Sequence, residues 1–461
     1  MTQKDKTETD KIIKKIKRLA GRSILKNATG KWNEAMELIE RGDELIKSFQ
    51  ENLPRELEDA HCDLLYNKST IFLKRGLLGH YFRWISEYST VAQKYGNKRH
   101  IALSTYLFAV HYWRSNDFNK ALEHIESAIM LIEECYKNDD HFPIYWANEV
   151  YYHAIRIVIE RKELELARNY LKRIEEICEL NLNDPLLNIS YQLSEACLLK
   201  ASKRARDRVR AEELYKEVCK TEMRPDWALT EALIGRCELL LIELKSTNEI
   251  EIIDEIKPLL EELINLGQQT QSEFTLLEVY VLQGKLSLLT FEIRIARRFL
   301  VQAQRIAERC GYKSIAEEIT RLHKDLRGNL DEWENLKQQN APLSKRIKLA
   351  RITEDMSRQF SKEIVDMEEV VEKKVTVYSE LKTCVVCKGS AAGFNIYVCP
   401  QCSSIYCKGC AEAVIELENA CWTCESPIDK AKPSQLFEKK EEEIKIGTKN
   451  SKNTPKNKKT V

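Results

Sequence analysis

Glycine and proline are scarce in this chain of 461 residues, with only 15 and 10 copies respectively. Few residues are therefore available for the tight turns that a large β-sheet protein needs. Charged residues make up 31% of the chain and hydrophobic residues 43%, a balance typical of long amphipathic helices. The composition predicts a mainly α protein and argues against a mostly β fold.

The sequence also lacks an excess of either charge and any long hydrophobic run. Lys and Arg number 73 against 72 Asp and Glu, a formal net charge of +1, so no global field would hold the chain on nucleic acid. We therefore do not favour nucleic acid as a partner, although a local basic patch would suffice for contact. Apolar runs such as the one at 239–242 are far shorter than the ~20 residues that span a bilayer. Because the N-terminus also lacks the apolar core of a secretory signal, we expect no membrane span and a cytoplasmic location.

Catalytic signatures are missing as well. The chain contains no Gly-rich phosphate loop ending in Lys-Ser/Thr, no His-Glu-x-x-His and no Gly-x-Ser-x-Gly. His111 and His153 stand beside aromatic residues in predicted helices, and we interpret them as core or surface residues. We name no catalytic and no cofactor-binding side chain. The sequence leaves enzymatic activity open and leans against it.

A helical repeat fills the chain from about residue 30 to 311. Small residues recur at intervals of roughly 39 to 47 residues, at Ala35, Ala121, Ala167, Ala211 and Ala296, with weaker equivalents near Phe82 and Ile253. Prolines at Pro143, Pro185, Pro225 and Pro258 are expected to lie between the units. One apolar stripe comprises Leu103, Tyr106, Leu107, Val110 and Trp113, and a second comprises Leu122, Ile125, Ile129 and Ile132. Each unit is therefore predicted to be an antiparallel helix pair, and six or seven pairs stack into an α-solenoid.

Two stretches carry a resemblance to a known repeat family. "RSNDFNKALEHIESAIMLIEEC", from Arg114 to Cys135, and "RVRAEELYKEVCK", from Arg208 to Lys220, resemble the second half of a tetratricopeptide repeat. The period exceeds the usual 34 residues of that family, so the chain looks like an elongated, degenerate variant. HEAT-type and other helical repeats have similar periods. The resemblance implies a solenoid that binds proteins or peptides.

Eight of the 15 cysteines form four Cys-x-x-Cys pairs near the C-terminus. The pairs are Cys384 with Cys387, Cys399 with Cys402, Cys407 with Cys410, and Cys421 with Cys424. Zinc takes four thiolates, so eight cysteines predict two closed, structural zinc sites. The four-residue gap between the second and third pairs favours crossed pairing. Site 1 would then be Cys384, Cys387, Cys407 and Cys410, and site 2 would be Cys399, Cys402, Cys421 and Cys424; sequential pairing is the alternative.

The segment "YVCPQCSSIYCKGCAEAVIELENACWTC", from Tyr397 to Cys424, resembles the all-cysteine RING finger of a core subunit of the general transcription and DNA-repair helicase factor. The resemblance implies a cross-braced module with a short helix over about 411–418. In RING ligases an apolar residue between the first two ligands contacts the conjugating enzyme, and Val386 fits that position. Trp422 stands where proline is frequent, and Glu425 stands where many active members have a basic residue. Ubiquitin ligase activity is therefore not favoured.

These features define five segments. We expect a basic N-terminal helix at 1–29, with Ile12, Ile13, Ile16 and Leu19 on its apolar side, and a tetratricopeptide-like solenoid at 30–343. An amphipathic helical linker at 344–380 follows, with an apolar stripe at Leu349, Ile352, Met356, Phe360, Ile364, Met367 and Val371. A RING-like zinc module at 381–429 and a disordered lysine-rich tail at 430–461 complete the chain.

The predicted function is that of a protein-interaction scaffold whose solenoid binds one protein and whose zinc module engages another. The first alternative is a RING-type ubiquitin-like ligase, with the solenoid as substrate receptor and the zinc module recruiting a conjugating enzyme. A component of transcription or repair machinery is a further alternative, which rests only on the resemblance of the finger.

Overall fold

A computed structural model describes residues 3–49, 53–115, 117–137, 142–179, 184–222, 224–310, 313–354, 356, 382–388, 390–391, 396–402, 404–417, 419–424, 426 and 428. The chain forms two compact units, of which the first comprises Met1–Leu300 and Ala307–Val370 and the second comprises Val301–Ile306 and Val371–Val461. Phe360, Ile364, Met367 and Val371, together with the predicted tail at 430–461, lie outside the described residues.

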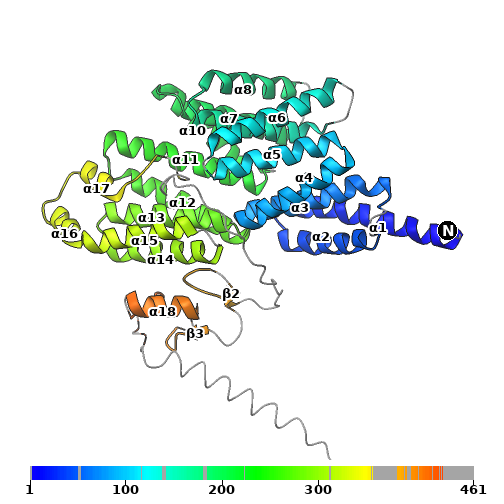
Figure 1. The fold of residues 1–461 in the computed structure, drawn as a ribbon. Coiled ribbons are helices and arrows are strands. Elements are labelled where there is room, and N and C mark those ends of the chain that lie inside the picture. Colours follow the sequence, from blue (N-terminus) through cyan, green and yellow to red (C-terminus); the bar gives the residue numbers. More distant parts are fainter. Residues whose placement is uncertain are drawn as a thin grey trace, which may run out of the picture. The chain divides into compact units, whose positions relative to one another are not determined.

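The first unit is built almost entirely of helices that follow one another along the chain (Figure 1). The helices are α1 (Gln3–Ala28), α2 (Trp32–Lys47), α3 (Glu58–Arg75), α4 (Leu78–Tyr95), α5 (Lys98–Arg114), α6 (Phe118–Lys137), α7 (Ile144–Glu160), α8 (Leu164–Glu179), α9 (Pro185–Lys200), α10 (Ala205–Lys220), α11 (Asp226–Thr247), α12 (Ile252–Gln269), α13 (Glu273–Leu289), α14 (Ile293–Cys310), α15 (Lys313–Gly328), α16 (Leu330–Gln338) and α17 (Leu343–Ala350). A short 3-10 turn at Arg55–Leu57 precedes α3.

The helices from α1 to α12 pack as consecutive pairs, and the odd-numbered helices from α1 to α11 also pack each against the next odd-numbered one. Among the described residues, no two even-numbered helices pack against each other as extensively as successive odd-numbered helices do. The odd-numbered helices therefore form one continuous layer, and the even-numbered helices lie outside it. This arrangement is that of an α-solenoid, and it confirms the predicted fold class.

The recurring alanines explain how closely the two layers approach. Ala35, Ala121, Ala167, Ala211 and Ala296 all lie in even-numbered helices and are 0% exposed. A methyl side chain lets two helix backbones pack closely where a larger one would hold them apart. In α4 the sequence places the corresponding buried position near Phe82, but Phe82 is 38% exposed. The buried residue is its neighbour Tyr81, which is 0% exposed.

Three of the four prolines stand at helix starts. Pro143 and Pro225 precede the first residues of α7 and α11, and Pro185 is the first residue of α9, where Asp184 accepts a hydrogen bond from the N–H of Leu186 at 2.9 Å. The expectation that Pro258 lies between units is wrong, because it lies inside α12. The apolar stripe of that helix is deeply buried on both sides of the proline, and this packing offsets one missing backbone hydrogen bond.

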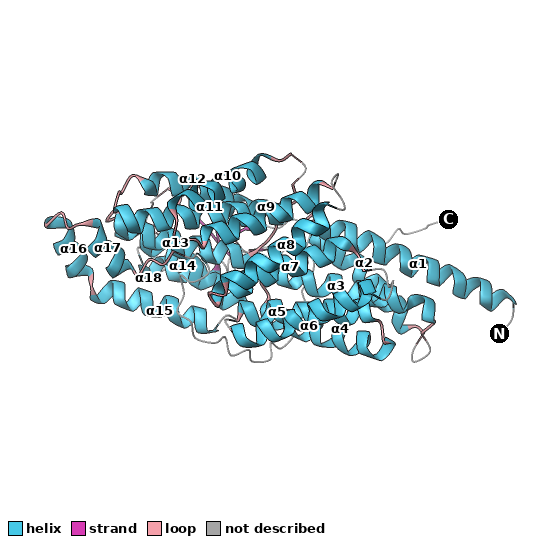
Figure 2. Ribbon diagram, turned by 90° about the horizontal axis from the view of Figure 1, so that it is seen from above, coloured by secondary structure: helices cyan, strands magenta, loops and turns pink. Residues whose placement is uncertain are grey.

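The N-terminal helix is amphipathic, as its sequence indicates. Ile13, Ile16 and Leu19 of α1 are buried, whereas the lysines between them are exposed. Ile13 and Ile16 belong to a cluster that includes Trp32 and Ala35 of α2, so α1 is the first helix of the first pair. The start of α1 projects beyond α2 (Figures 1 and 2).

The predicted continuous helix after residue 344 ends early. α17 stops at Ala350, and Arg351 adopts a left-handed conformation with φ of +51°. Residues 352–354 are not helical, and Ile352 and Met356 are both buried. Because the helix breaks at Arg351, Leu349 and Ile352 do not lie on one continuous helical stripe.

None of the described helices combines the length and the apolar character needed to cross a membrane. Of the seven cysteines in the helical part of the chain, Cys62, Cys135 and Cys237 are buried and the other four are half-buried. This placement fits cysteines that act as small packing residues.

Apart from Val301–Ile306 of α14, the described part of the second unit contains two short antiparallel strand pairs and one helix. β1 (Lys382–Thr383) pairs with β2 (Ser390–Ala391), and β3 (Ile396–Val398) pairs with β4 (Ile405–Cys407). α18 (Lys408–Leu417) follows β4 directly. The predicted short helix is therefore present, and it begins three residues earlier than the sequence indicated.

Candidate metal centre

The four Cys-x-x-Cys pairs come together as two groups of four thiols. The first group is Cys384, Cys387, Cys407 and Cys410, and the second is Cys399, Cys402, Cys421 and Cys424. Within each group all four Sγ atoms lie within 4.8 Å of one another. The crossed arrangement is confirmed, and the sequential alternative is wrong.

The local fold explains why these thiols converge. Cys407 ends β4 and Cys410 lies in the first turn of α18, so the start of the helix turns both thiols to one side. The opposing pair stands on a tight turn in which the N–H of Lys388 donates to the carbonyl oxygen of Cys384 at 2.9 Å. The N–H of Val385 also donates to the carbonyl oxygen of Ile405 at 2.8 Å, which fixes this turn to β4.

The second group is held by two similar turns. The N–H of Cys399 donates to the carbonyl oxygen of Ser404 at 2.9 Å, and the N–H of Cys421 donates to that of Ser426 at 2.7 Å. A hydrogen bond from the N–H of Ile428 to the carbonyl oxygen of Asn419, at 2.9 Å, closes the chain around the last pair. Each turn therefore presents two thiols before any ion is considered.

The sulfur spacing matches zinc. Four thiolates at ~2.3 Å from a tetrahedral ion lie about 3.8 Å apart. The observed Sγ–Sγ distances are 3.9 Å between Cys387 and Cys407 and 3.6 Å for both Cys399–Cys424 and Cys402–Cys421. All eight donors are sulfur, which favours zinc over calcium or magnesium. Four protein thiolates per ion leave no open position for substrate, so both sites are structural in type.

Tyr406 supports one ligand of the second group. Its hydroxyl lies 3.0 Å from Cys421 Sγ, and it accepts the backbone N–H of Trp422 at 2.9 Å. Burial raises the pKa of Tyr406 well above its usual range, so the phenol keeps its proton and donates to the thiolate. Sequence reasoning does not single out this role of Tyr406, because a hydroxyl partner 15 residues away leaves no local signal.

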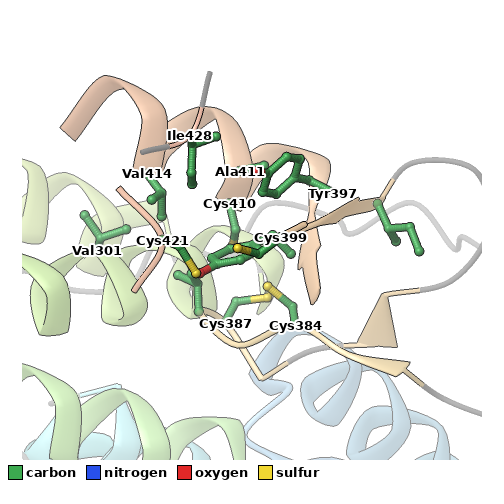
Figure 3. Packing of buried hydrophobic residues seen from close by; sticks show 13 residues of the cluster. Val301, Cys384, Cys387, Tyr397, Cys399, Cys410, Ala411, Val414, Cys421 and Ile428 are labelled. Carbon is green, nitrogen blue, oxygen red and sulfur yellow. The ribbon is translucent and has the colours of Figure 1, made fainter. Parts of the chain in front are cut away.

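A small hydrophobic core surrounds the thiols. It includes the buried side chains of Val386, Tyr397, Val414 and Ile428, and Figure 3 shows several of these residues beside the cysteines. The rings of Tyr397 and Tyr406 pack with their centroids 5.8 Å apart. Val386 is 0% exposed, so it does not present the accessible apolar contact expected of a ligase. Glu425, another residue weighed for ligase activity, lies outside the described residues.

The two singled-out histidines are packing residues. His111 is 5% exposed, and burial lowers its pKa to about 4. Burial also lowers the pKa of His153 to about 4, and its Nδ1 lies 3.1 Å from the hydroxyl of Tyr106 and 3.0 Å from the carbonyl oxygen of Glu149. Both imidazoles are therefore neutral at pH 7, and both lie among aromatic rings of the solenoid.

No protein-family model matches this chain, and no curated protein matches its sequence. The assignment of the chain therefore depends on the fold and on the two thiol groups.

Proposed function

We propose that this protein is an interaction scaffold in which a tetratricopeptide-like solenoid binds one protein and a RING-like zinc module engages another. The observation that carries the proposal is the combination of a continuous helical layer with a separate module held by two closed metal sites. Helical solenoids offer extended surfaces for protein partners. Closed four-thiolate sites stabilise a fold without supplying an open position for chemistry.

The scaffold proposal predicts that partners fall into two separable sets. Cross-linked partners of the full chain are identified by mass spectrometry and compared with those of Cys421→Ser, which removes one ligand of the second group. Cys178→Ser, a half-buried solenoid cysteine, is the matched control. We expect Cys421→Ser to lose one set and keep another, and Cys178→Ser to keep both. Loss of every partner, or of none, in Cys421→Ser argues against two independent binding parts.

The ligase alternative is favoured by one observation, the crossed arrangement of the two thiol groups, which is the arrangement of RING modules. In that alternative the module recruits a conjugating enzyme and the solenoid selects the substrate. It is tested by mixing the full chain with ubiquitin, activating enzyme and a panel of conjugating enzymes. Conjugates that form with the wild type and disappear with Cys384→Ser would replace the scaffold proposal with a ligase.

A further inference from the structure

After α17 the chain leaves the helix at Arg351 and contacts first α13 and then α11 through its described residues 351–354 and 356, which we term the strap. α17 packs against α13, and Arg346 Nη1 donates to the carbonyl oxygen of Leu289, the last residue of α13, at 2.6 Å. The guanidinium of Arg346 also lies 4.9 Å from the ring centroid of Phe291. The strap therefore starts from a helix that is fixed to the solenoid.

The main chain of the strap is held at both ends by side chains of the solenoid. Lys285 Nζ of α13 donates to the carbonyl oxygen of Arg351 at 2.9 Å. The N–H of Met356 donates to Glu238 Oε1 of α11 at 3.0 Å, and Glu238 forms an ion pair with Lys200 of α9. Because these contacts reach backbone atoms, they hold the strap whatever its side chains are.

The side chains of the strap supply the sequence-dependent contacts. Ile352 and Met356 are 5% and 1% exposed, whereas Glu354 between them is half exposed. Glu354 Oε1 pairs with Lys245 Nζ of α11 at 2.8 Å. Backbone contacts combined with pockets for alternate side chains are the general way in which a surface recognises an extended peptide.

From these contacts we propose that the strap occupies, within its own chain, a binding surface for a short acidic–aliphatic peptide of a partner protein. The surface takes two aliphatic side chains four residues apart with a carboxylate between them, and Lys245 selects the carboxylate. The partner peptide and the strap compete for the same groups, so the strap must leave before the partner binds. This inference rests on the proposed function, because it assigns the surface through which the solenoid binds a partner.

The experiment uses a fluorescein-labelled peptide of residues 349–358 and the full chain. A segment tethered beside its own site acts at an effective concentration on the order of millimolar, so the strap of the wild type excludes the added peptide. The double substitution Ile352→Asn and Met356→Asn removes both aliphatic anchors of the strap and leaves α11 and α13 intact. Fluorescence anisotropy should show that this variant binds the peptide at least about tenfold more tightly than the wild type does.

Two control variants isolate the surface. Leu25→Asn with Met130→Asn makes the same kind of change at side chains that are 63% and 66% exposed, and it should not increase binding. Adding Lys245→Glu to the loosened variant should abolish binding of the native peptide. A peptide carrying Glu354→Lys should then bind that triple variant, because the charge swap restores the ion pair.

A second variant tests the same idea in case the double substitution prevents folding. Glu354→Lys places a cation opposite Lys245 at a half-exposed position, and it should also release the strap and raise peptide affinity. Equal binding by the wild type and both loosened variants, or no binding by folded loosened variants, overturns the inference. Neither result decides the proposed function, which is tested separately by comparing the cross-linked partners of the full chain with those of Cys421→Ser.

Discussion

Gly235 shows how one missing side chain shapes the packing of α10 and α11. A Cβ at this position would overlap the ring of Tyr215, approaching Cε1 to 2.6 Å. Alanine gains ~1 kcal/mol of helix propensity over glycine, whereas overpacking a tight core costs ~1–3 kcal/mol. We expect Gly235→Ala to lower the free energy of unfolding by about 1 kcal/mol, measured by urea denaturation. Gly21→Ala in α1, where no atom lies within 4 Å, should instead stabilise; equal effects at both sites would contradict this explanation.

His111 should make the solenoid less stable in mild acid. Its folded-state pKa is about 4, against ~6.5 in the unfolded chain, because burial disfavours the imidazolium. Between these values the unfolded state binds a proton that the folded state does not, so stability falls as pH drops from 6.5 toward 4. At 1.36 kcal/mol per unit, this pKa difference sets a full loss of about 3 kcal/mol, most of which occurs between pH 6.5 and 4.

The measurement compares the wild type with His111→Phe at pH 7 and pH 4.5. Phenylalanine has a ring but no titrating group, so the variant should lose less stability between the two pH values. Any packing cost of the substitution is present at both pH values and cancels in this comparison. An equal loss in both proteins would mean that His111 is protonated without penalty.

Tyr406 should act on zinc through Cys421. Removing a hydrogen bond to a metal ligand typically lowers metal affinity 10–100-fold. We therefore expect Tyr406→Phe to release zinc from the second group at roughly tenfold lower chelator concentration than the wild type. Tyr397→Phe is the matched control, because it removes a hydroxyl from the neighbouring strand and the structure assigns that hydroxyl no contact with a thiol. If both variants retain zinc as the wild type does, the hydroxyl of Tyr406 does not support the site.

At the scale of elements, the sequence predicts the positions where helices cross closely. It does not predict features that depend on contacts with residues far away along the chain. The buried alanines of the even-numbered helices were identified because helix crossings restrict residue size at regular intervals. Pro258 was misplaced because proline marks a boundary only when no tertiary packing compensates for it. The spacing of Ile352 and Met356 also suits an amphipathic stripe and predicts a continuous helix, but α17 ends at Ala350. The groups that hold the strap, Lys285 of α13 at Arg351 and Glu238 of α11 at Met356, lie more than 60 residues away along the chain.

The metal centre was predicted more completely than the strap, because ligand type and spacing carry the chemistry of zinc. Spacing alone favoured crossed pairing without excluding sequential pairing. The structure selects crossed pairing through strand β4, which leads directly into α18 and brings the third pair to the first. The contribution of Tyr406 cannot be predicted from the sequence, because it depends on a contact between two separate parts of the module.

Double substitutions test the pairing directly. Cys384→Ser with Cys407→Ser removes two ligands from one group, so we expect one zinc per chain by native mass spectrometry. Cys384→Ser with Cys399→Ser damages both groups, so we expect no tightly bound zinc. Sequential pairing predicts the reverse order of zinc content in the two variants. That reversed order would disprove the crossed arrangement.

At the scale of the whole molecule, the two units obtain their stability from different sources. Each solenoid helix buries an apolar stripe against its neighbours, so stability is distributed along many similar interfaces. The zinc module has one helix of 10 residues and strands of two or three residues among its described part. A core this small cannot offset the conformational entropy of folding without its metal ions.

Removal of zinc should therefore unfold the module and leave the solenoid helical. Structural zinc contributes roughly 10–16 kcal/mol per site, far more than the net stability of a typical domain, so a strong chelator removes the main stabilising term of the module. Far-UV circular dichroism should lose no more than the contribution of α18, while amide exchange should become fast across the module and stay slow in α3 to α13. A cooperative loss of helix signal from the whole chain would show that the solenoid also depends on the metal centre. Zinc added back in excess should restore slow exchange in the module, because the Cys-x-x-Cys turns supply all the ligands that refolding requires.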